Sequence, residues 1–410
     1  MIKKEYATPT VILYVVVAAL LAFGLCMLYS TSSAVHGTSA KVFLKQLLWI
    51  FIGGGAAVFI QFVDYRVLCK YSKLLMLCIG LPLLYLASVH VFVKMGVISK
   101  NVIPKLPFLA SGSIKGAYRW LKLGPISIQP SEFAKIVIFI FLADYFHRNN
   151  RFSGEFWKGF LLPLICGGGI IALILLGGSL SITVITGSVV LAIFFVSGVR
   201  LRYILSLAAA GVMMVFMIAK ISPERMERLT SYQNPEALSQ GAGYQLWASL
   251  LALGSGNWKG QGFANSKLKH EYLPEAHTDF ILAIVGEELG FIAILFVAIC
   301  YLTYFIMAIW IAKNAVDYRG IIISVGIGTS IFLHFLVNLG VVSGAVPTTG
   351  VTAPFISYGG SSMMSAMLAT GLLINVARYS SIDSEETAEI DASQTNWSNR
   401  SLSETHHDSI

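Results

Sequence analysis

The stretch SKLKHEYLPEAHTDFILAIVGEELGF, Ser266–Phe291, decides how the rest of the chain is read. It passes from a polar, charged approach directly into an apolar helix pattern, and Asp279 stands at the join. Ala283, Gly286 and Gly290 then follow at steps of four, three and four, which is one face of a helix. A face of small residues lets another helix backbone come close, so the sequence predicts Asp279 at the mouth of a packed seam.

Asp279 has two readings at this stage. A carboxylate at a helix start is stabilised by the helix dipole and is common there. The pair Glu287–Glu288, however, falls roughly 12–14 Å further along the same apolar segment, at 1.5 Å per residue. Carboxylates in such a segment are costly and usually have a partner or a function, so a functional reading of this region stays open.

The composition indicates a polytopic membrane protein. The chain has 410 residues, 56% of them hydrophobic and 12% charged, and its mean hydropathy is +0.73. No soluble fold of this length can hide so much apolar surface. Because backbone polar groups in lipid must bond internally, the long apolar runs predict helices rather than barrel strands. The five cysteines show no C-x-x-C spacing, which predicts neither a metal site nor a disulfide framework.

We therefore expect an all-α membrane domain over residues 1–380 with about ten spans, and a disordered cytoplasmic tail over residues 381–410. The expected spans are 11–30, 46–63, 73–93, 132–148, 158–176, 180–198, 202–220, 279–312, 320–343 and 355–378. Lysine and arginine of the short loops then fall on one side, which places that side and both termini in the cytoplasm.

Two long loops, 94–131 and 221–278, lie outside in this topology. Loop 94–131 contains basic residues and no acidic one, which predicts an anionic partner, either lipid headgroups or a phosphorylated substrate. Loop 221–278 contains the apolar stretch Tyr244–Gly256, which is too short to span a bilayer. We expect it to form an interfacial or re-entrant helix over the outer face.

The stretch GAYRWLKLGPISIQPSEFAK, Gly116–Lys135, leads into the fourth span. Glu132 suits the positive end of a helix, but Lys135 lies one turn inside an apolar segment. Lys135 either pairs with Glu132 or faces a polar cavity and a ligand phosphate. Arg119, next to Trp120, is either an anchor at the membrane interface or a bidentate phosphate ligand.

Two further stretches interrupt the apolar pattern. VPTTGVTAPFISYGGSS, Val346–Ser362, is longer than a turn between two helices requires. Broken backbone at membrane depth is tolerated only where it is buried in protein or lines a cavity, and we expect that here. The glycine-rich run GSGNWKGQGF, Gly254–Phe263, is expected to be flexible and to expose its backbone.

Taken together, QPSEFAK, GYQ, SLLALGSG, YLPEAHTDF, GEELGF and APFISYGGSS resemble the SEDS family (shape, elongation, division and sporulation) of bacterial cell-wall proteins. The resemblance covers nearly the whole membrane part, in the family's order. YLPEAHTDF and GYQ are more similar to the division branch, FtsW, than to the elongation branch, RodA. Membership implies a ten-span glycosyltransferase that polymerises lipid II outside the bacterial cytoplasmic (inner) membrane, at the division site.

The resemblance also implies site residues. The family's essential carboxylate corresponds to Asp279, and its basic residues in GA-x-RW and QPSE-x-x-K correspond to Arg119 and Lys135. Asp279 is then the candidate base on the attacking hydroxyl, and the two cations are candidates to neutralise the leaving pyrophosphate. The other residues expected at the substrate site are Gln129, Glu132, Lys269, Glu275, His277 and Ser361. Among these, Glu275 and His277 are expected to orient or support the site rather than act as a second base.

The chain departs from the family's pattern at four places. Ser179 lies where the family often has an acidic-Pro-Asp-x-Gly stretch, and Thr349 replaces a lysine of the division branch. Ala248 and Leu268 stand where glutamines are expected. These changes put individual donor or acceptor contacts in doubt and leave the family resemblance intact.

The implied partners are lipid II, a class B penicillin-binding protein (the transpeptidase) and other membrane proteins of the division machinery, with no nucleic acid. A divalent cation, Mg²⁺ or Mn²⁺, on the pyrophosphate is compatible with the chemistry, although the sequence contains no ligand cluster that announces a metal site. Two alternatives to an enzyme remain: a flippase that carries a lipid-linked precursor across the bilayer, and a non-catalytic scaffold. Clustering of the site at the outer face favours the enzyme, since a transporter site is expected nearer mid-membrane.

Overall fold

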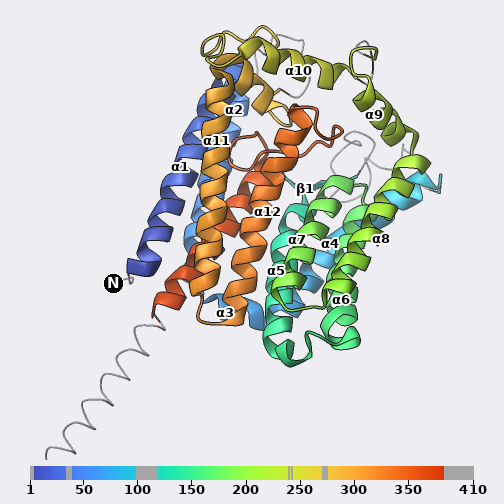
Figure 1. Ribbon diagram of the computed structural model, residues 1–410, viewed down its shortest axis with the longest axis vertical. Coiled ribbons are helices and arrows are strands. Elements are labelled where there is room, and N and C mark those ends of the chain that lie inside the picture. Colours follow the sequence, from blue (N-terminus) through green and yellow to red (C-terminus); the bar gives the residue numbers. More distant parts are fainter. Residues whose placement is uncertain are drawn as a thin grey trace, which may run out of the picture.

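The computed structural model describes residues 4–33, 39–97, 118–124, 126–238, 241, 243–269 and 276–382. Within these ranges the chain forms a bundle of long helices with a small hairpin (Figure 1). The elements are α1 Lys4–Ser33, α2 Ser39–Ile60, α3 Tyr65–Lys70, α4 Ser72–Lys94, β1 Leu121–Leu123, β2 Ile126–Ile128, α5 Pro130–Asn149, the 3₁₀ turn Asn150–Phe152, the π-helical turn Phe156–Leu161, α6 Leu162–Leu176, α7 Leu180–Val196, α8 Leu201–Ile221, α9 Pro223–Gln233, α10 Tyr244–Gly256, α11 Ile281–Asn314, α12 Tyr318–Val342 and the C-terminal helix Gly360–Ile382.

The predicted all-α membrane fold is confirmed, and each of the ten expected spans coincides with a helix. Among the described residues, eight helices are long and apolar enough to cross a membrane. The other two expected spans are α7, which has 17 residues, and α5, which has 20 residues and carries several charged side chains. Residues 381 and 382 continue the C-terminal helix, and the rest of the expected tail lies outside the described residues.

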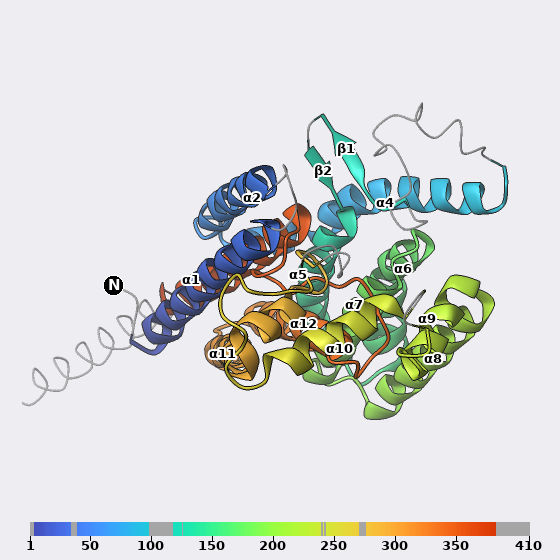
Figure 2. The ribbon, with the colours of Figure 1, turned by 90° about the horizontal axis from the view of Figure 1, so that it is seen from above.

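Helix α12 lies in the middle of the bundle, with α5, α7 and α11 around it (Figure 2). Most of its side chains are buried, as are those of the C-terminal helix. Helix α8, in contrast, exposes large apolar side chains such as Val212, Phe216 and Ile221. An apolar helix with an exposed face fits lipid contact, so the interior of the bundle is where polar groups have to be explained.

Helix α11 is broken at Gly290, where the sequence predicts one continuous span. Gly290 has φ +76° and ψ −174°, a conformation that an L side chain rarely adopts. The segment after α10 takes up the freed backbone groups: Gln261 N donates to Glu287 O at 2.8 Å, and Phe291 N donates to Asn257 O at 2.9 Å. Part of the glycine-rich run thus pairs its backbone with the break instead of exposing it.

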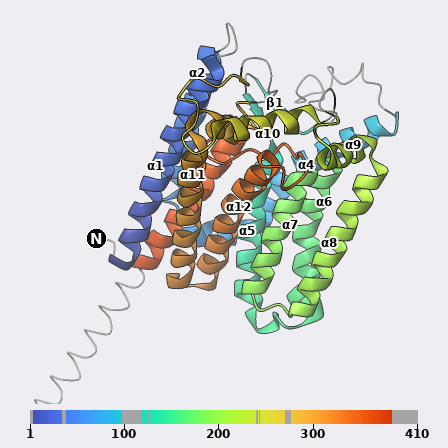
Figure 3. The ribbon, with the colours of Figure 1, turned by 45° about the horizontal axis from the view of Figure 1, so that its top comes forward.

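The expected short helix of the second long loop is present as α10, and it runs across one end of the bundle (Figure 3). It packs on the first section of α11 through glycines, because a Cβ on Gly256 would lie 1.8 Å from the Gly286 carbonyl oxygen. The predicted small-residue face of α11 therefore does admit a second helix at Gly286, whereas Gly290 breaks the helix.

Candidate active site

Asp279 lies in the turn of residues 276–280 that leads into α11, and only 8% of the residue is exposed. Asn338 of α12 fixes this turn, since its side-chain nitrogen donates to the carbonyl oxygens of Asp279 at 2.8 Å and Val351 at 2.5 Å. The carboxylate faces Gly350, because a Cβ on that glycine would lie 3.2 Å from Asp279 Oδ2. The fold therefore holds a largely buried carboxylate against the loop that follows α12.

That loop, residues 343–359 (the 343–359 loop), is held by side chains from two other helices. Ser181 of α7 donates to the Thr349 carbonyl oxygen at 2.9 Å, and Arg228 of α9 donates to that of Thr348 at 3.4 Å. The middle of the loop is packed inside the bundle, at Val351, Ala353, Phe355, Ile356 and Ser357. The expectation that this broken backbone is buried in protein is confirmed.

His277 belongs to the same turn as Asp279 and is half-buried. Its carbonyl oxygen accepts from Tyr358 N at 2.9 Å, and the two rings lie 5.7 Å apart. His277 thus links the turn to the end of the 343–359 loop, which suits the orienting role expected of it. Glu275 lies outside the described residues.

Arg119 comes just before the β1–β2 hairpin and is half-buried. Its Nη2 donates to the Gly178 carbonyl oxygen in the turn between α6 and α7, at 2.5 Å. Burial, together with the positive charges of Arg228 and Arg225, lowers the pKa of the Arg119 guanidinium to about 10. A cation held among other cations in a partly buried place is prepared to receive an anion.

Lys135 and Glu132, one turn apart on α5, form a buried ion pair of 2.8 Å. The Lys135 ammonium also contacts His334 Nε2 of α12 at 2.9 Å, and His334 Nδ1 lies 2.7 Å from the Ser330 carbonyl oxygen. Because that carbonyl can only accept, His334 carries its proton on Nδ1 and accepts from Lys135 through Nε2. The structure thus realises the ion-pair alternative for Lys135 and adds a histidine to it.

The start of α5 is joined to the C-terminal helix. Gln129 N donates to Ser361 Oγ at 3.0 Å, and Ser365 Oγ donates to the Glu132 carbonyl oxygen at 2.7 Å. Three of the residues expected at the site, Gln129, Glu132 and Ser361, therefore lie together. In this arrangement their groups serve to seat α5 against the C-terminal helix.

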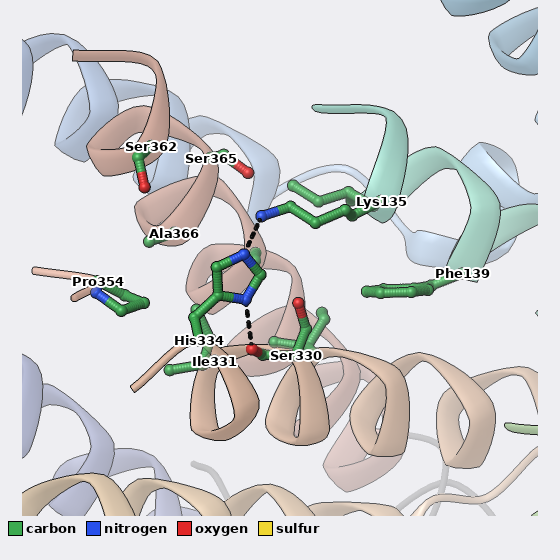
Figure 4. A pocket seen from close by; sticks show the side chains of 12 residues that line it. Lys135, Phe139, Ser330, Ile331, His334, Pro354, Ser362, Ser365 and Ala366 are labelled. Atoms are coloured by element: carbon green, nitrogen blue, oxygen red, sulfur yellow. Dashed lines mark hydrogen bonds between the residues drawn. The ribbon is translucent and has the colours of Figure 1, made fainter. Parts of the chain in front are cut away.

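A small cavity opens beside Lys135 and His334, lined also by Pro354, Ser362 and Ser365 (Figure 4). Its volume is about 20 Å³, which is enough for a water molecule among polar partners. The cavity joins α5, α12, the 343–359 loop and the C-terminal helix. Lys135 therefore borders a small cavity of mixed, mainly apolar lining as well as its ion-pair partner.

Lys269 has a different environment from the other expected site residues. Its ammonium donates to Glu288 Oε1 at 2.8 Å, to Ser30 Oγ at 3.0 Å and to the Ala264 carbonyl oxygen at 2.6 Å. An ammonium has three protons, so all of them have partners. The Lys269 side chain is only 1% exposed. We therefore place Lys269 in the support of the site, where it fastens the segment before Asp279 to α1 and α11, rather than against substrate.

The expected site residues thus fall into two groups that α12 connects. Asn338 contacts the Asp279 turn, and His334, one turn earlier on the same helix, contacts Lys135. Arg119 is connected to the loop near Asp279 through the α6–α7 turn. It bonds to Gly178 in that turn, and Ser181, at the start of α7, bonds to Thr349 of the 343–359 loop. Sequence reasoning missed His334 and Asn338, although polar groups inside an apolar span were a usable signal. Arg228 gave no signal beyond a charge in a long loop.

Two of the four positions that depart from the family pattern are buried, and Leu268 and Thr349 are half-buried. Ser179 and Ala248 are buried, and Thr349 Oγ1 is a buried atom with no hydrogen-bond partner among the described residues. Within the same ranges, no group of three or more His, Cys, Asp or Glu side chains gathers as metal ligands. A divalent ion on the substrate's pyrophosphate stays a prediction.

The fold and the site define a polytopic α-helical membrane protein with a buried carboxylate and several cations near one end of the bundle. The model of the cell cycle protein family that comprises FtsW, RodA and SpoVE matches residues 11–382. The chain belongs to this family, and the resemblance seen in its motifs is confirmed.

Two relatives and one solved structure are similar over most of their length. Stage V sporulation protein E of Bacillus subtilis (strain 168) is 36% identical over 380 residues, covering 91% of this chain and 98% of that protein. The probable peptidoglycan glycosyltransferase FtsW of Aliivibrio salmonicida (strain LFI1238) is 34% identical, covering 85% and 82%. A chain of a peptidoglycan synthase complex that coordinates polymerization and crosslinking has the same fold, with a TM-score of 0.69, 22% identity, and coverage of 90% and 97%.

Proposed function

We propose that this chain is a peptidoglycan glycosyltransferase that polymerises lipid II at the outer face of the cytoplasmic membrane during cell division. The observation that carries the proposal is the buried carboxylate of Asp279, which faces Gly350 and stands in a turn that Asn338 holds through the Asp279 backbone carbonyl oxygen. Family membership and relatives named as probable peptidoglycan glycosyltransferases support it. A largely buried carboxylate at the end of an apolar helix is the kind of group that catalysis requires.

The reaction is an inverting glycosyl transfer between two lipid-linked disaccharides. The acceptor's sugar hydroxyl attacks the donor's anomeric carbon, a C–O bond forms, and the bond to the lipid pyrophosphate breaks with its electron pair leaving on the pyrophosphate. Asp279 takes the proton of the attacking hydroxyl. Arg119 stabilises the negative charge that develops on the leaving group. Lys135, paired with Glu132 and His334, supports this charge from within the bundle.

We further propose a class B penicillin-binding protein as the partner that cross-links the strands. The solved complex with the same fold coordinates polymerization and crosslinking, which supports such a pairing for this chain. Lipid II and the other membrane proteins of the division machinery are the remaining proposed partners.

A lipid II flippase is the second candidate. The buried group Lys135, Glu132 and His334 favours it, because ionisable residues inside a helix bundle are typical of transport pathways.

Purified full-length chain, with its partner transpeptidase and fluorescent lipid II, tests the proposal by gel separation of the glycan strands. Asp279→Asn keeps the size of the side chain and removes the proton acceptor, so polymerisation should fall by about 10²–10⁴-fold. Binding of lipid II should change little, because the group acts mainly in the transition state.

The matched control is Glu236→Gln, because Glu236 is an exposed carboxylate after α9. This variant should polymerise lipid II at the parental rate. Near-parental polymerisation by Asp279→Asn would refute the assignment of the base. If the parent made no strands but moved lipid II across liposomes, the flippase would be the correct function.

A further inference from the structure

His334 of α12 uses both of its ring nitrogens inside the bundle (Figure 4). Its Nδ1 donates to the Ser330 carbonyl oxygen at 2.7 Å, one turn earlier on the same helix. Its Nε2 accepts from the Lys135 ammonium of α5 at 2.9 Å. Because the bond to Ser330 fixes the ring on α12, His334 presents an acceptor of set direction to Lys135.

The charges of this buried group balance when the imidazole is neutral. Glu132 supplies one negative charge and Lys135 one positive charge, and the two groups lie 2.8 Å apart. Apart from Lys135 and His334, the side chains that line the adjacent cavity carry no charge. A proton on Nε2 would put a second positive charge within 2.9 Å of the ammonium, in a place where charges are costly. A neutral acceptor therefore suits this position, since it holds the ammonium without adding charge.

The bond to His334 changes what the Lys135 ammonium is attached to. Glu132 and Lys135 lie one turn apart on α5, so their ion pair needs nothing from another helix. His334 draws the same ammonium to α12, beside the cavity between the two helices. An ammonium has three protons, and two of them have partners among the described residues, so one donor remains for a further contact.

Helix α12 also holds the turn that carries Asp279. Asn338 follows His334 by one turn, about 6 Å of rise, and its side chain donates to the Asp279 carbonyl oxygen. One continuous helix thus sets the place of both the Asp279 turn and the Lys135 ammonium. The position of Lys135 relative to Asp279 consequently depends on His334 as well as on α5.

We propose that His334 is a positioning residue for the glycosyl transfer, and that its neutral imidazole holds the Lys135 ammonium in register with Asp279. This inference rests on the proposed function and deepens it. Lys135 stabilises charge that develops on the leaving pyrophosphate most strongly when its ammonium is already in place. His334 contacts neither the sugar nor the pyrophosphate and moves no proton, because it acts through Lys135.

Strand formation from fluorescent lipid II, by the full-length chain with its partner transpeptidase, tests this role when kcat and KM are measured separately. His334→Leu should lower kcat about tenfold, the effect of losing a hydrogen bond to a charged group. KM should change little, because the contact acts on the transition state. His334→Gln should restore kcat to near the parental value, since its amide oxygen is again a neutral acceptor.

Ser324→Ala is the matched control on the same helix. Ser324 is buried, and its hydroxyl has no hydrogen-bond partner among the described residues, so this variant should keep the parental kcat. In a Lys135→Met background, His334→Leu should lower kcat no further, because the histidine acts through the lysine. Losses that add in the double variant would overturn the proposal, and so would a parental kcat in His334→Leu.

His334→Asn decides the question if His334→Leu does not fold. It supplies a neutral amide, as His334→Gln does, but its side chain is shorter by one methylene. It should therefore lose the contact with Lys135, and kcat should again fall about tenfold. A kcat equal to that of His334→Gln would contradict the positioning role.

The parental protein separates this inference from the proposed function. If the parent forms no glycan strands in the same assay, the polymerase assignment fails and the positioning role fails with it. If the parent forms strands while His334→Leu keeps the parental kcat, only the positioning role is wrong.

Discussion

At the scale of single residues, Gly350 limits the position of the Asp279 carboxylate, the proposed base. Its φ of +70° is in the left-handed region, and a Cβ there would lie 3.2 Å from Asp279 Oδ2. A side chain at this position would strain the loop and press on the carboxylate at once. A glycine that takes no part in the proposed chemistry thus determines where the Asp279 carboxylate lies.

Gly350→Ala is expected to lower polymerisation roughly 10²-fold, because displacement of a catalytic group by about 1 Å has an effect of this size. The measurement is the rate of glycan-strand formation from fluorescent lipid II. Gly187→Ala on α7 is the control, since a Cβ at that glycine meets nothing within 4 Å. Equal rates for Gly350→Ala and the parent would show that Asp279 does not need the present geometry.

At the scale of elements, a buried network fastens the segment before Asp279 to two helices. Glu288 of α11 accepts from Lys269, from Ser30 of α1 and from the backbone N–H of Ala264, and its side chain is fully buried. The neighbouring Glu287 accepts from Ser266 Oγ and from backbone N–H groups of the same segment. Both carboxylates deep in this apolar helix therefore have hydrogen-bond partners, which explains how they are tolerated there.

Removing one member of the Lys269–Glu288 pair should destabilise the protein by about 3–5 kcal/mol, since the other charge is left buried without its partner. We expect Lys269→Met and Glu288→Gln each to lower the thermal unfolding temperature in detergent. The double variant Lys269→Met/Glu288→Met should recover part of the loss, because no uncompensated charge then remains. A double variant less stable than either single one would argue against this account.

At the scale of the whole molecule, the topology is testable with single cysteines in a background free of the native ones. The positive-inside pattern puts the segment after α10 outside and the end of α11 inside. Lys259, in the segment after α10, and Lys313, at the end of α11, are both exposed. In intact cells an impermeant thiol reagent should label Lys259→Cys and spare Lys313→Cys. The reverse pattern would invert the topology.

Hydropathy was sufficient to predict the helices that coincide with the ten expected spans, since it depends only on local composition. The break of α11 could not be predicted in this way, because Gly290 fits a small-residue helix face equally well until the Asn257–Gly262 segment is seen beside it. The motifs identified Asp279, Arg119 and Lys135, but not what each one contacts. His334 beside Lys135, and Glu288 beside Lys269, are partners from distant parts of the chain, and only the packing of α12 and α11 reveals them.

The break at Gly290 also has a consequence for depth in the bilayer. Before it, α11 is enclosed by protein from Ile281 to Glu288; after it, the helix exposes Phe291, Ile292 and Leu295. The section Phe291–Asn314 is about 36 Å long at 1.5 Å per residue, and the hydrocarbon core is about 30 Å thick. The section Phe291–Asn314 is therefore long enough to cross the hydrocarbon core by itself. The section Ile281–Glu288, which leads back to Asp279, then lies at the level of the lipid headgroups. In the proposed reaction, a polyprenyl substrate then presents its sugars to Asp279 while its tail stays in the membrane.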